Sequence, residues 1–265
     1  MAPGRTPVTA PSKARLAAVR RLTRRKDRLA TGSFLAEGPQ AVREAIRAGA
    51  AEELWHVGPR EQVGEDLGLE LSRFDLPSWQ VEPAVLKQLT STVTPQGMVA
   101  VCRTPVAQGL PAGARLVVVC AEVRDPGNAG TVIRSADAFG ADAVILTSGS
   151  VELTNPKTVR ASVGSIFHLP ILTDRSLPQA LELVRAQGLQ VWAADGGGTL
   201  LDQVEERLAA PTAWLLGNEA WGLPPEVASQ ADDIVGVPMY GSAESLNLAT
   251  AAAVCLYASA TAQRR

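Results

Sequence analysis

Residues 217–223, with the sequence Gly-Asn-Glu-Ala-Trp-Gly-Leu, indicate how the rest of the chain is organised. They follow the apolar run 213–216, which is typical of a buried strand, and they precede Pro224 and Pro225, which suit the first turn of a helix. Loops beyond the ends of parallel strands are where open α/β sheets bind ligands, and glycine lets backbone approach a ligand closely. The stretch predicts either a site-building loop that presents Glu219 or a tight surface connection.

Unbroken apolar runs recur along the second half of the chain, and helical patterns separate them. Strands are expected at residues 115–123, 143–146, 167–172, 189–194, 213–216 and 234–237. Helices are expected at residues 128–139, with Asn128 as the cap, at 177–187 and at 246–262. Strands without alternation are buried on both faces, so the pattern predicts an α/β fold with a parallel sheet. The glycine-rich residues 195–198 lack the lysine of a phosphate-binding loop and predict a flexible turn.

The first half of the chain predicts a smaller unit. Residues 1–11 are rich in proline and predict a disordered tail, and residues 12–103 predict a small α/β domain. Ser12 is expected to cap a helix that runs from Lys13 to about Arg25. Residues 104–113 have the proline and glycine content of a linker, so residues 114–265 form the second expected domain.

Charge is unevenly distributed along the 265 residues. Residues 1–30 hold nine Lys or Arg and a single acid, whereas the remainder carries a net charge of −10. A solvated basic helix is one explanation, but the asymmetry favours a polyanion partner, nucleic acid above all. The candidate phosphate-binding residues are Arg20, Arg21, Arg24, Arg25 and Lys26.

Composition excludes several classes of protein. No run of about 18 apolar residues is present and the start of the chain lacks a signal-peptide core, so we expect a cytoplasmic protein with no membrane span. Cys102, Cys120 and Cys255 are scattered, which argues against a disulfide framework and against a metal site. His56 and His168 are expected to be structural. The glycine fingerprints of dehydrogenases and nucleotide triphosphatases are missing, as are the metalloprotease and serine hydrolase motifs.

Four polar segments lie beside the expected strands and carry the chemistry. They read N-A-G-T-V-I-R-S-A-D-A-F-G at residues 128–140, N-P-K-T-V-R-A-S-V-G at 155–164, G-N-E-A-W-G-L at 217–223 and P-M-Y-G-S-A-E-S-L-N at 238–247. The second segment places Lys157 and Arg160 near glycine, which suits a phosphate. A surface ion pair is the alternative for the helical Arg134.

In this order and spacing the four segments resemble the SpoU (TrmH-type) ribose 2′-O-methyltransferases of the SPOUT superfamily. The resemblance covers residues 115–265, and residues 30–103 are similar to the small RNA-binding domain that precedes many members. It implies a parallel sheet whose C-terminal segment forms a deep trefoil knot, a bent S-adenosylmethionine bound in that knot, and a homodimer formed through the methyltransferase domain.

The resemblance also implies residue roles. Gly217, Val237 and Leu246 match the positions that contact the cofactor. The polar positions at the reaction centre are matched by Asn128, Arg134, Glu219, Ser245 and Asn247. We expect Arg134 to orient the phosphate and ribose, Glu219 to organise Arg134 or its loop, and Ser245 and Asn247 to position ribose or cofactor.

Two positions depart from the family pattern. Ala249 stands where a small polar residue is common, and Trp221 is bulkier than the usual residue and is expected to pack on RNA or on the partner subunit. The leading hypothesis is methylation of a ribose 2′-hydroxyl in structured RNA, ribosomal rather than transfer RNA. The alternatives are a transfer RNA 2′-O-methyltransferase, a catalytically silent RNA-binding protein of ribosome assembly, and a Rossmann-like nucleotide enzyme.

Overall fold

The computed structural model describes residues 10–218 and 220–265, and they divide into two compact units. The N-terminal unit extends to Pro105 and includes Thr154–Phe167, and the C-terminal unit comprises Val106–Leu153 and His168–Arg265. Residues 1–9 of the expected tail and Glu219 lie outside the described residues. Residues 154–167 pack with the N-terminal unit although they lie within the second domain expected from the sequence, at 114–265.

The N-terminal unit is built on a four-stranded sheet of order β1-β4-β2-β3, in which only the β2–β3 pair is parallel. Its strands are β1 (Ser33–Glu37), β2 (Ala51–His56), β3 (Ser78–Gln80) and β4 (Met98–Arg103). Its helices are α1 (Lys13–Arg21), α2 (Arg25–Thr31), α3 (Pro39–Arg47), α4 (Arg60–Leu67), α5 (Pro83–Leu86) and α7 (Pro156–Ser162).

Helix α1 begins where expected but ends earlier. The hydroxyl of Ser12 accepts a hydrogen bond from the amide of Arg15, which confirms the cap. The helix ends at Arg21, and the buried guanidinium of Arg28 donates to the carbonyl groups of the two residues that follow it, to Leu22 O at 3.2 Å and to Thr23 O at 3.1 Å. The chain then turns into α2, so the basic residues are spread over two short helices.

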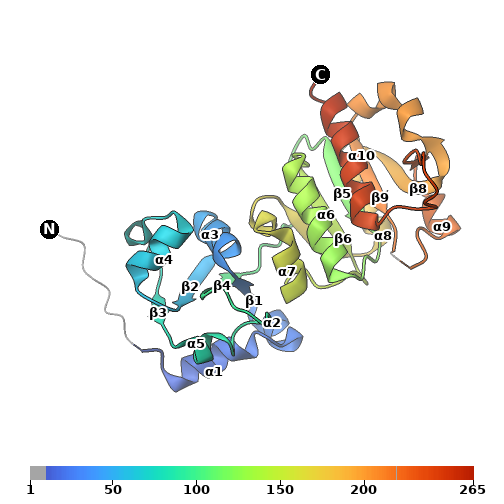
Figure 1. The fold of residues 1–265 in the computed structure, drawn as a ribbon. Coiled ribbons are helices and arrows are strands. Elements are labelled where there is room, and N and C mark those ends of the chain that lie inside the picture. The colour runs from blue at the N-terminus through green and yellow to red at the C-terminus, as the bar shows by residue number, and fades with distance from the viewer. Residues whose placement is uncertain (1–9, 219) are drawn as a thin grey trace. The chain divides into compact units, whose positions relative to one another are not determined.

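The C-terminal unit contains a six-stranded parallel sheet of order β10-β8-β9-β5-β6-β7 (Figure 1), which confirms the expected α/β class. Its strands are β5 (Leu116–Cys120), β6 (Ala143–Thr147), β7 (Ile171–Arg175), β8 (Gln190–Leu200), β9 (Thr212–Leu216) and β10 (Asp233–Gly236). Its helices are α6 (Pro126–Ala138), α8 (Leu177–Ala186), α9 (Pro225–Ala228) and α10 (Leu248–Ala262), and α6 and α10 lie side by side.

Alternate side chains of the central strands lie on opposite faces of this sheet. Val191 and Leu215 belong to the buried cluster that includes the α8 side chains. Trp192 and Trp214 point the other way and meet edge to face, with ring centroids 5.5 Å apart. The buried indole of Trp214 donates to the hydroxyl of Ser259 on α10 at 2.9 Å, so the polar atom it buries is satisfied.

Three local expectations were wrong. The cap of α6 is Asp125, whose carboxylate accepts from the amide of Asn128, and the helix starts at Pro126. Residues 165–167 form a 3₁₀ turn, and β7 begins only at Ile171. Residues 195–198 are part of β8 rather than a turn, because their backbone packs closely against β10.

The cysteines and one of the two histidines assigned to structural roles are enclosed by the fold, whereas His168 is exposed and pairs with Asp137 at 2.7 Å. Cys102, Cys120 and Cys255 are buried, and burial raises the pKa of the Cys255 thiol to about 12. His56 is fully buried, and burial lowers the pKa of its imidazole. Within residues 10–218 and 220–265 no helix is long and apolar enough to cross a membrane, and no group of three metal-binding side chains occurs.

The close approach of β8 to β10 predicts that replacing Gly198 with alanine destabilises the protein and that replacing the adjacent Gly197 does not. A Cβ atom on Gly198 would lie 1.9 Å from the carbonyl oxygen of Ile234, whereas a Cβ on Gly197 would meet nothing within 4 Å. We expect Gly198→Ala to lower the free energy of unfolding by about 1–3 kcal/mol or more, because the clash is with backbone. Gly197→Ala is the matched control and should unfold in urea like wild type. Equal stability of the two variants would contradict the close approach.

Candidate active site

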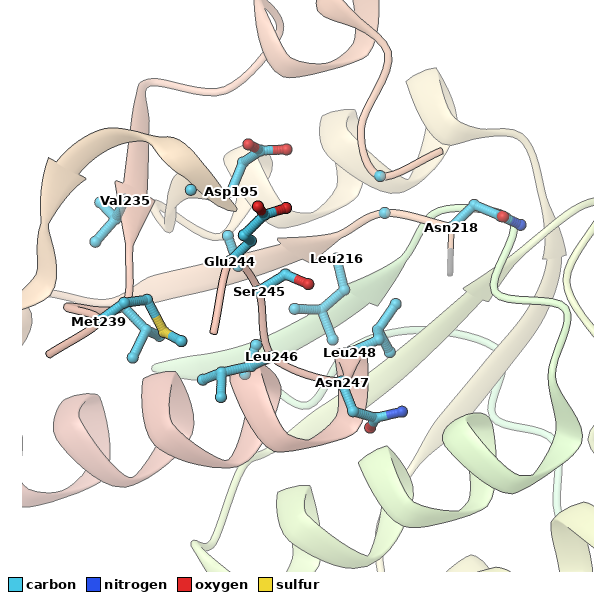
Figure 2. A pocket seen from close by; sticks show the side chains of 16 residues that line it. Asp195, Leu216, Asn218, Val235, Met239, Glu244, Ser245, Leu246, Asn247 and Leu248 are labelled. Atoms are coloured by element: carbon cyan, nitrogen blue, oxygen red, sulfur yellow. The ribbon is translucent and has the colours of Figure 1, made fainter. Parts of the chain in front are cut away.

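A cavity of about 630 Å³ opens at the carboxyl ends of β9 and β10 and beside the middle of β8 (Figure 2). Its wall is completed by the segment 237–247, which leads from β10 to α10. The strand order reverses next to β9, one of the strands beside the cavity, because β5 has β6 on one side and the later β9 on the other. The side chains that line it are Leu216, Asn218, Val235, Val237, Met239, Glu244, Ser245, Leu246, Asn247 and Leu248, together with Asp195.

The loop after β9 is closed by paired backbone. Asn218 and Gly222 exchange two hydrogen bonds of 2.9 and 2.8 Å, and the buried Asn218 side chain donates to Glu122 O at 2.7 Å. A Cβ atom on Gly217 would lie 2.4 Å from the carbonyl of Gly222, so only glycine fits there. The loop after β9 is therefore a constrained turn whose Asn218 side chain is bonded to the residue that follows the end of β5.

Both polar atoms of the Asn247 side-chain amide form hydrogen bonds. Its Oδ1 accepts from the amides of Ala249 and Thr250, which caps α10, and its Nδ2 donates to Asn128 Oδ1 at 3.0 Å. Two of the expected polar residues, 119 positions apart in the chain, are thus brought together by the fold. Ala249 keeps its amide bonded to this cap although its side chain is apolar.

The three expected cofactor residues all line the cavity. Gly217 contributes backbone, Val237 and Leu246 contribute apolar surface, and Ser245 lies beside them. Sequence reasoning missed two carboxylates in the same wall, those of Asp195 and Glu244 (Figure 2). The only signal for Asp195 was its place immediately before the glycine run.

Arg134 is not among the residues that line the cavity. Its side chain is exposed on α6 and forms no ion pair or hydrogen bond with any other residue that the structure describes. The ion pair considered as its alternative role is therefore not formed within residues 10–218 and 220–265. Glu219, its expected organiser, lies outside the described residues.

Trp221 lies at the tip of the loop after β9, next to the cavity. Its side chain is 53% exposed, and the guanidinium of Arg124 stands over the ring, 5.0 Å from the centroid. Arg124 in turn pairs with Glu122 at 2.8 Å. A cation over an indole face is an attractive arrangement that fixes both groups.

The expected phosphate-binding residues differ in their surroundings. Arg20, Arg24 and Lys26 are exposed, and none forms an ion pair with another described residue, whereas Arg21 is held by Asp27 at 2.6 Å. The remaining ones are Arg25, which has a partner, Lys157, which also has one, and Arg160, which bonds Ser91 Oγ and lies 3.7 Å from Glu37.

The two roles of Asn247 can be separated by substitution. Asn247→Ser keeps a capping oxygen but is too short to reach Asn128, whereas Asn247→Ala removes both. We expect Asn247→Ala to lower the free energy of unfolding by about 1 kcal/mol more than Asn247→Ser. In a double-mutant cycle, Asn128→Ala should cost less in the Asn247→Ser background than in the wild-type background. Additive losses in urea unfolding would show that the Asn128–Asn247 bond contributes nothing.

Comparison with known proteins places both units in known families. Residues 115–257 match the SpoU rRNA Methylase family, and residues 13–100 match the MRM3-like substrate binding domain. The 23S rRNA (guanosine(2553)-2′-O)-methyltransferase RlmP of Bacillus subtilis is 35% identical over 243 residues, which cover 90% of this chain and 92% of RlmP. The mitochondrial rRNA methyltransferase 3 of Mus musculus is 27% identical, covering 85% of this chain and 66% of that protein.

Solved structures agree with this assignment. The SpoU methyltransferase AviRb from Streptomyces viridochromogenes, in complex with the cofactor AdoMet, has a TM-score of 0.80 at 30% identity and covers 96% of this chain and 98% of AviRb. The AdoMet-bound rRNA methyltransferase from Sinorhizobium meliloti has a TM-score of 0.78 at 32% identity, with 95% and 96% covered. The resemblance in the four polar segments is confirmed, and the chain belongs to the SpoU rRNA methylase family.

Proposed function

We propose that this protein transfers a methyl group from S-adenosylmethionine to a ribose 2′-hydroxyl in ribosomal RNA. The observation that carries the proposal is the cavity beside β8, β9 and β10, whose wall contains residues of two of the four family segments. A third segment is joined to this wall by the hydrogen bond from Asn247 to Asn128. The family and its named rRNA-modifying relatives supply the reaction and the class of substrate.

The cavity fits the cofactor in size and in chemistry. A volume of about 630 Å³ lies within the roughly 300–1,000 Å³ of small-molecule sites. Val237, Met239 and Leu246 provide apolar surface, and the backbone at Gly217 and Gly196 offers hydrogen-bonding groups without side chains in the way. S-adenosylmethionine supplies an electrophilic methyl group on a sulfonium. The carboxylates of Asp195 and Glu244 suit a cationic ligand.

The residues around the cavity have positioning roles in this proposal. Ser245 orients the ribose or the cofactor, and Asn247 holds the wall through Asn128. Arg134 orients the substrate phosphate and ribose and stabilises the developing alkoxide. Glu219 holds Arg134 or its loop. An arginine stays protonated at neutral pH, so Arg134 is not assigned the role of base.

We further propose that the C-terminal segment forms the trefoil knot of the family. Strand β10 lies at the edge of the sheet, yet α10 returns to pack beside α6 and β9. The segment 237–247 makes this return across the carboxyl edge and forms a wall of the cavity. The close approach of Gly198 on β8 to Ile234 on β10, just before this segment, supports a tightly packed C-terminal topology.

A homodimer formed through α6 and α10 accounts for two features of this surface. Val254 and Tyr257 on α10 are exposed apolar side chains, at 36% and 60%. Arg134 lies on the adjacent α6 and not in the cavity of its own chain. We propose that Arg134 acts in the cavity of the partner subunit, which makes the dimer necessary for activity.

We propose that residues 12–103 bind the RNA and that residues 114–265 form the methyltransferase domain. The exposed Arg20, Arg24 and Lys26 of the N-terminal unit support the first role. Ribosomal RNA is favoured over transfer RNA by the relatives' names and by the substrate-binding model. A ribosomal substrate places the enzyme where ribosomes assemble, and we keep the cytoplasm as its proposed location.

Replacement of Arg134 tests catalysis directly. We expect Arg134→Ala to lower methyl transfer to total rRNA by at least about 100-fold, the scale of one missing stabilising donor, and to leave cofactor affinity unchanged by calorimetry. Arg185→Ala, which removes an exposed arginine of α8 that bonds Gln230 and Asp232, is the control for the loss of a surface cation. Wild-type turnover of Arg134→Ala would contradict the assignment, and a wild-type protein that binds no cofactor would favour a silent RNA-binding protein.

Mixing two inactive variants tests whether Arg134 acts across the dimer. Gly217→Ala disrupts the cofactor loop, so each of the two variants alone should be inactive. In a mixed dimer, the intact cavity of the Arg134→Ala chain faces the intact arginine of the Gly217→Ala chain, and activity should reappear. If Arg134 serves its own cavity, every mixture remains inactive, which would contradict the proposed arrangement.

Salt dependence tests the basic helices. We expect the triple change of Arg20, Arg24 and Lys26 to Gln to weaken rRNA binding and to reduce the slope of log affinity against log salt by about 0.7–0.9 for each phosphate that the variant no longer neutralises. The control replaces Arg47, Arg73 and Arg103, which are exposed cations of the same unit that already have partners. An equal reduction in slope for both triple variants would contradict a dedicated surface.

A further inference from the structure

We propose that Trp221 stacks on an unpaired nucleobase of the RNA beside the nucleotide to be methylated, and thereby selects single-stranded targets. This inference rests on the proposed function and adds a residue that determines substrate specificity. It is carried by the position of Trp221, by the way its ring is held and by the charged groups around it.

Position is the first argument. Asn218 and Gly222, on either side of the loop tip, both line the cavity, so Trp221 is one residue away from its wall. A 2′-hydroxyl that reaches this cavity brings its neighbouring nucleotides over the rim. Trp221 is the large aromatic side chain that this rim exposes in the loop after β9.

Rigidity is the second argument. The two hydrogen bonds between Asn218 and Gly222 fix the base of the loop, and Arg124 covers one side of the indole at 5.0 Å. Glu122 fixes Arg124 at 2.8 Å and accepts from Asn218 Nδ2 through its own carbonyl. More than half of the Trp221 side chain nevertheless stays exposed. A ring held in place before binding loses little entropy when a base stacks on it.

The surroundings favour RNA over the partner subunit. The side chains of Glu122 and Arg124 are 51% and 59% exposed beside the ring, and the buried centre of a protein interface is depleted in charged residues. Aromatic rings and guanidinium planes are the groups on which unpaired RNA bases stack. A base in a duplex is already stacked on its neighbours, so stacking on Trp221 selects for single strands.

Tryptophan fluorescence gives a direct test with full-length protein. Trp55, Trp192 and Trp214 are fully buried and Trp79 is partly buried, so Trp221 is the exposed one of the five tryptophans, all of which the structure describes. We expect a twelve-nucleotide single-stranded RNA of mixed sequence to quench wild-type fluorescence, and the same RNA in a duplex to quench it less. Trp221→Phe should abolish the quenching, whereas Trp79→Phe should retain it. Quenching that persists in Trp221→Phe would overturn the proposal.

Kinetics on rRNA provides the second readout. Trp221→Ala should raise KM for RNA by about 5- to 100-fold, the range expected for one stacked base, with kcat and cofactor affinity close to wild type. Trp221→Phe should recover most of the affinity, because a phenyl ring still stacks. A loss of kcat with unchanged KM, or a dimer that dissociates on sedimentation, would assign Trp221 to the site or to the partner subunit instead. Absence of methyl transfer by wild type would refute the proposed function and leave the quenching test valid.

Discussion

The hydrogen bonds of the Asn247 side chain fix the position of the segment that forms one wall of the cavity. Segment 237–247 has no helix or strand of its own, and it joins β10 to α10 across the carboxyl edge of the sheet. Asn247 satisfies the unpaired amides at the start of α10 and at the same time reaches Asn128 on α6. The loop is therefore fixed at its far end by two helices, and the side chains before Asn247 are placed by that anchor.

A second anchor works from the opposite side of the cavity. The buried Asn218 joins the loop after β9 to the carbonyl of Glu122, which follows β5. Gly217 permits this arrangement because no side chain fits against Gly222. Residues after two strands, β5 and β9, and at the starts of two helices, α6 and α10, are thus held by short hydrogen bonds between neighbouring elements. A binding site built from loops gains its precision from such fixed supports.

The sequence predicts the elements that depend on a local pattern of residues, and it fails where contacts with backbone far away in the chain determine the structure. The unbroken apolar runs identified the parallel sheet, because a strand covered on both faces excludes polar side chains. Asn128 was a reasonable cap in isolation, but Asp125 and Pro126 provide a better start three residues earlier. The glycine run 195–198 belongs to β8 because its backbone packs closely against β10, although the β8 residues that pair with β10 lie on either side of the run, and no local pattern reveals this.

The same distinction holds for the candidate site. Gly217, Val237 and Leu246 were found through motif positions, and they do line one cavity. Asp195 was missed because nothing in the sequence places it near residues 217 and 244. The partners of Arg160, which lie on β1 and at Ser91 in the first half of the chain, were also out of reach of sequence reasoning.

The chemistry of the proposed reaction explains why the cavity is built largely from backbone and apolar side chains. A ribose hydroxyl is a weak nucleophile, and a guanidinium is too weak a base to take its proton. In the proposed mechanism the proton acceptor is the phosphate of the RNA substrate, which Arg134 would orient. Correct alignment of the hydroxyl with the methyl group supplies up to about 7–11 kcal/mol. An enzyme that works mainly by alignment needs rigid walls more than reactive side chains, and the anchors at Asn218 and Asn247 provide them.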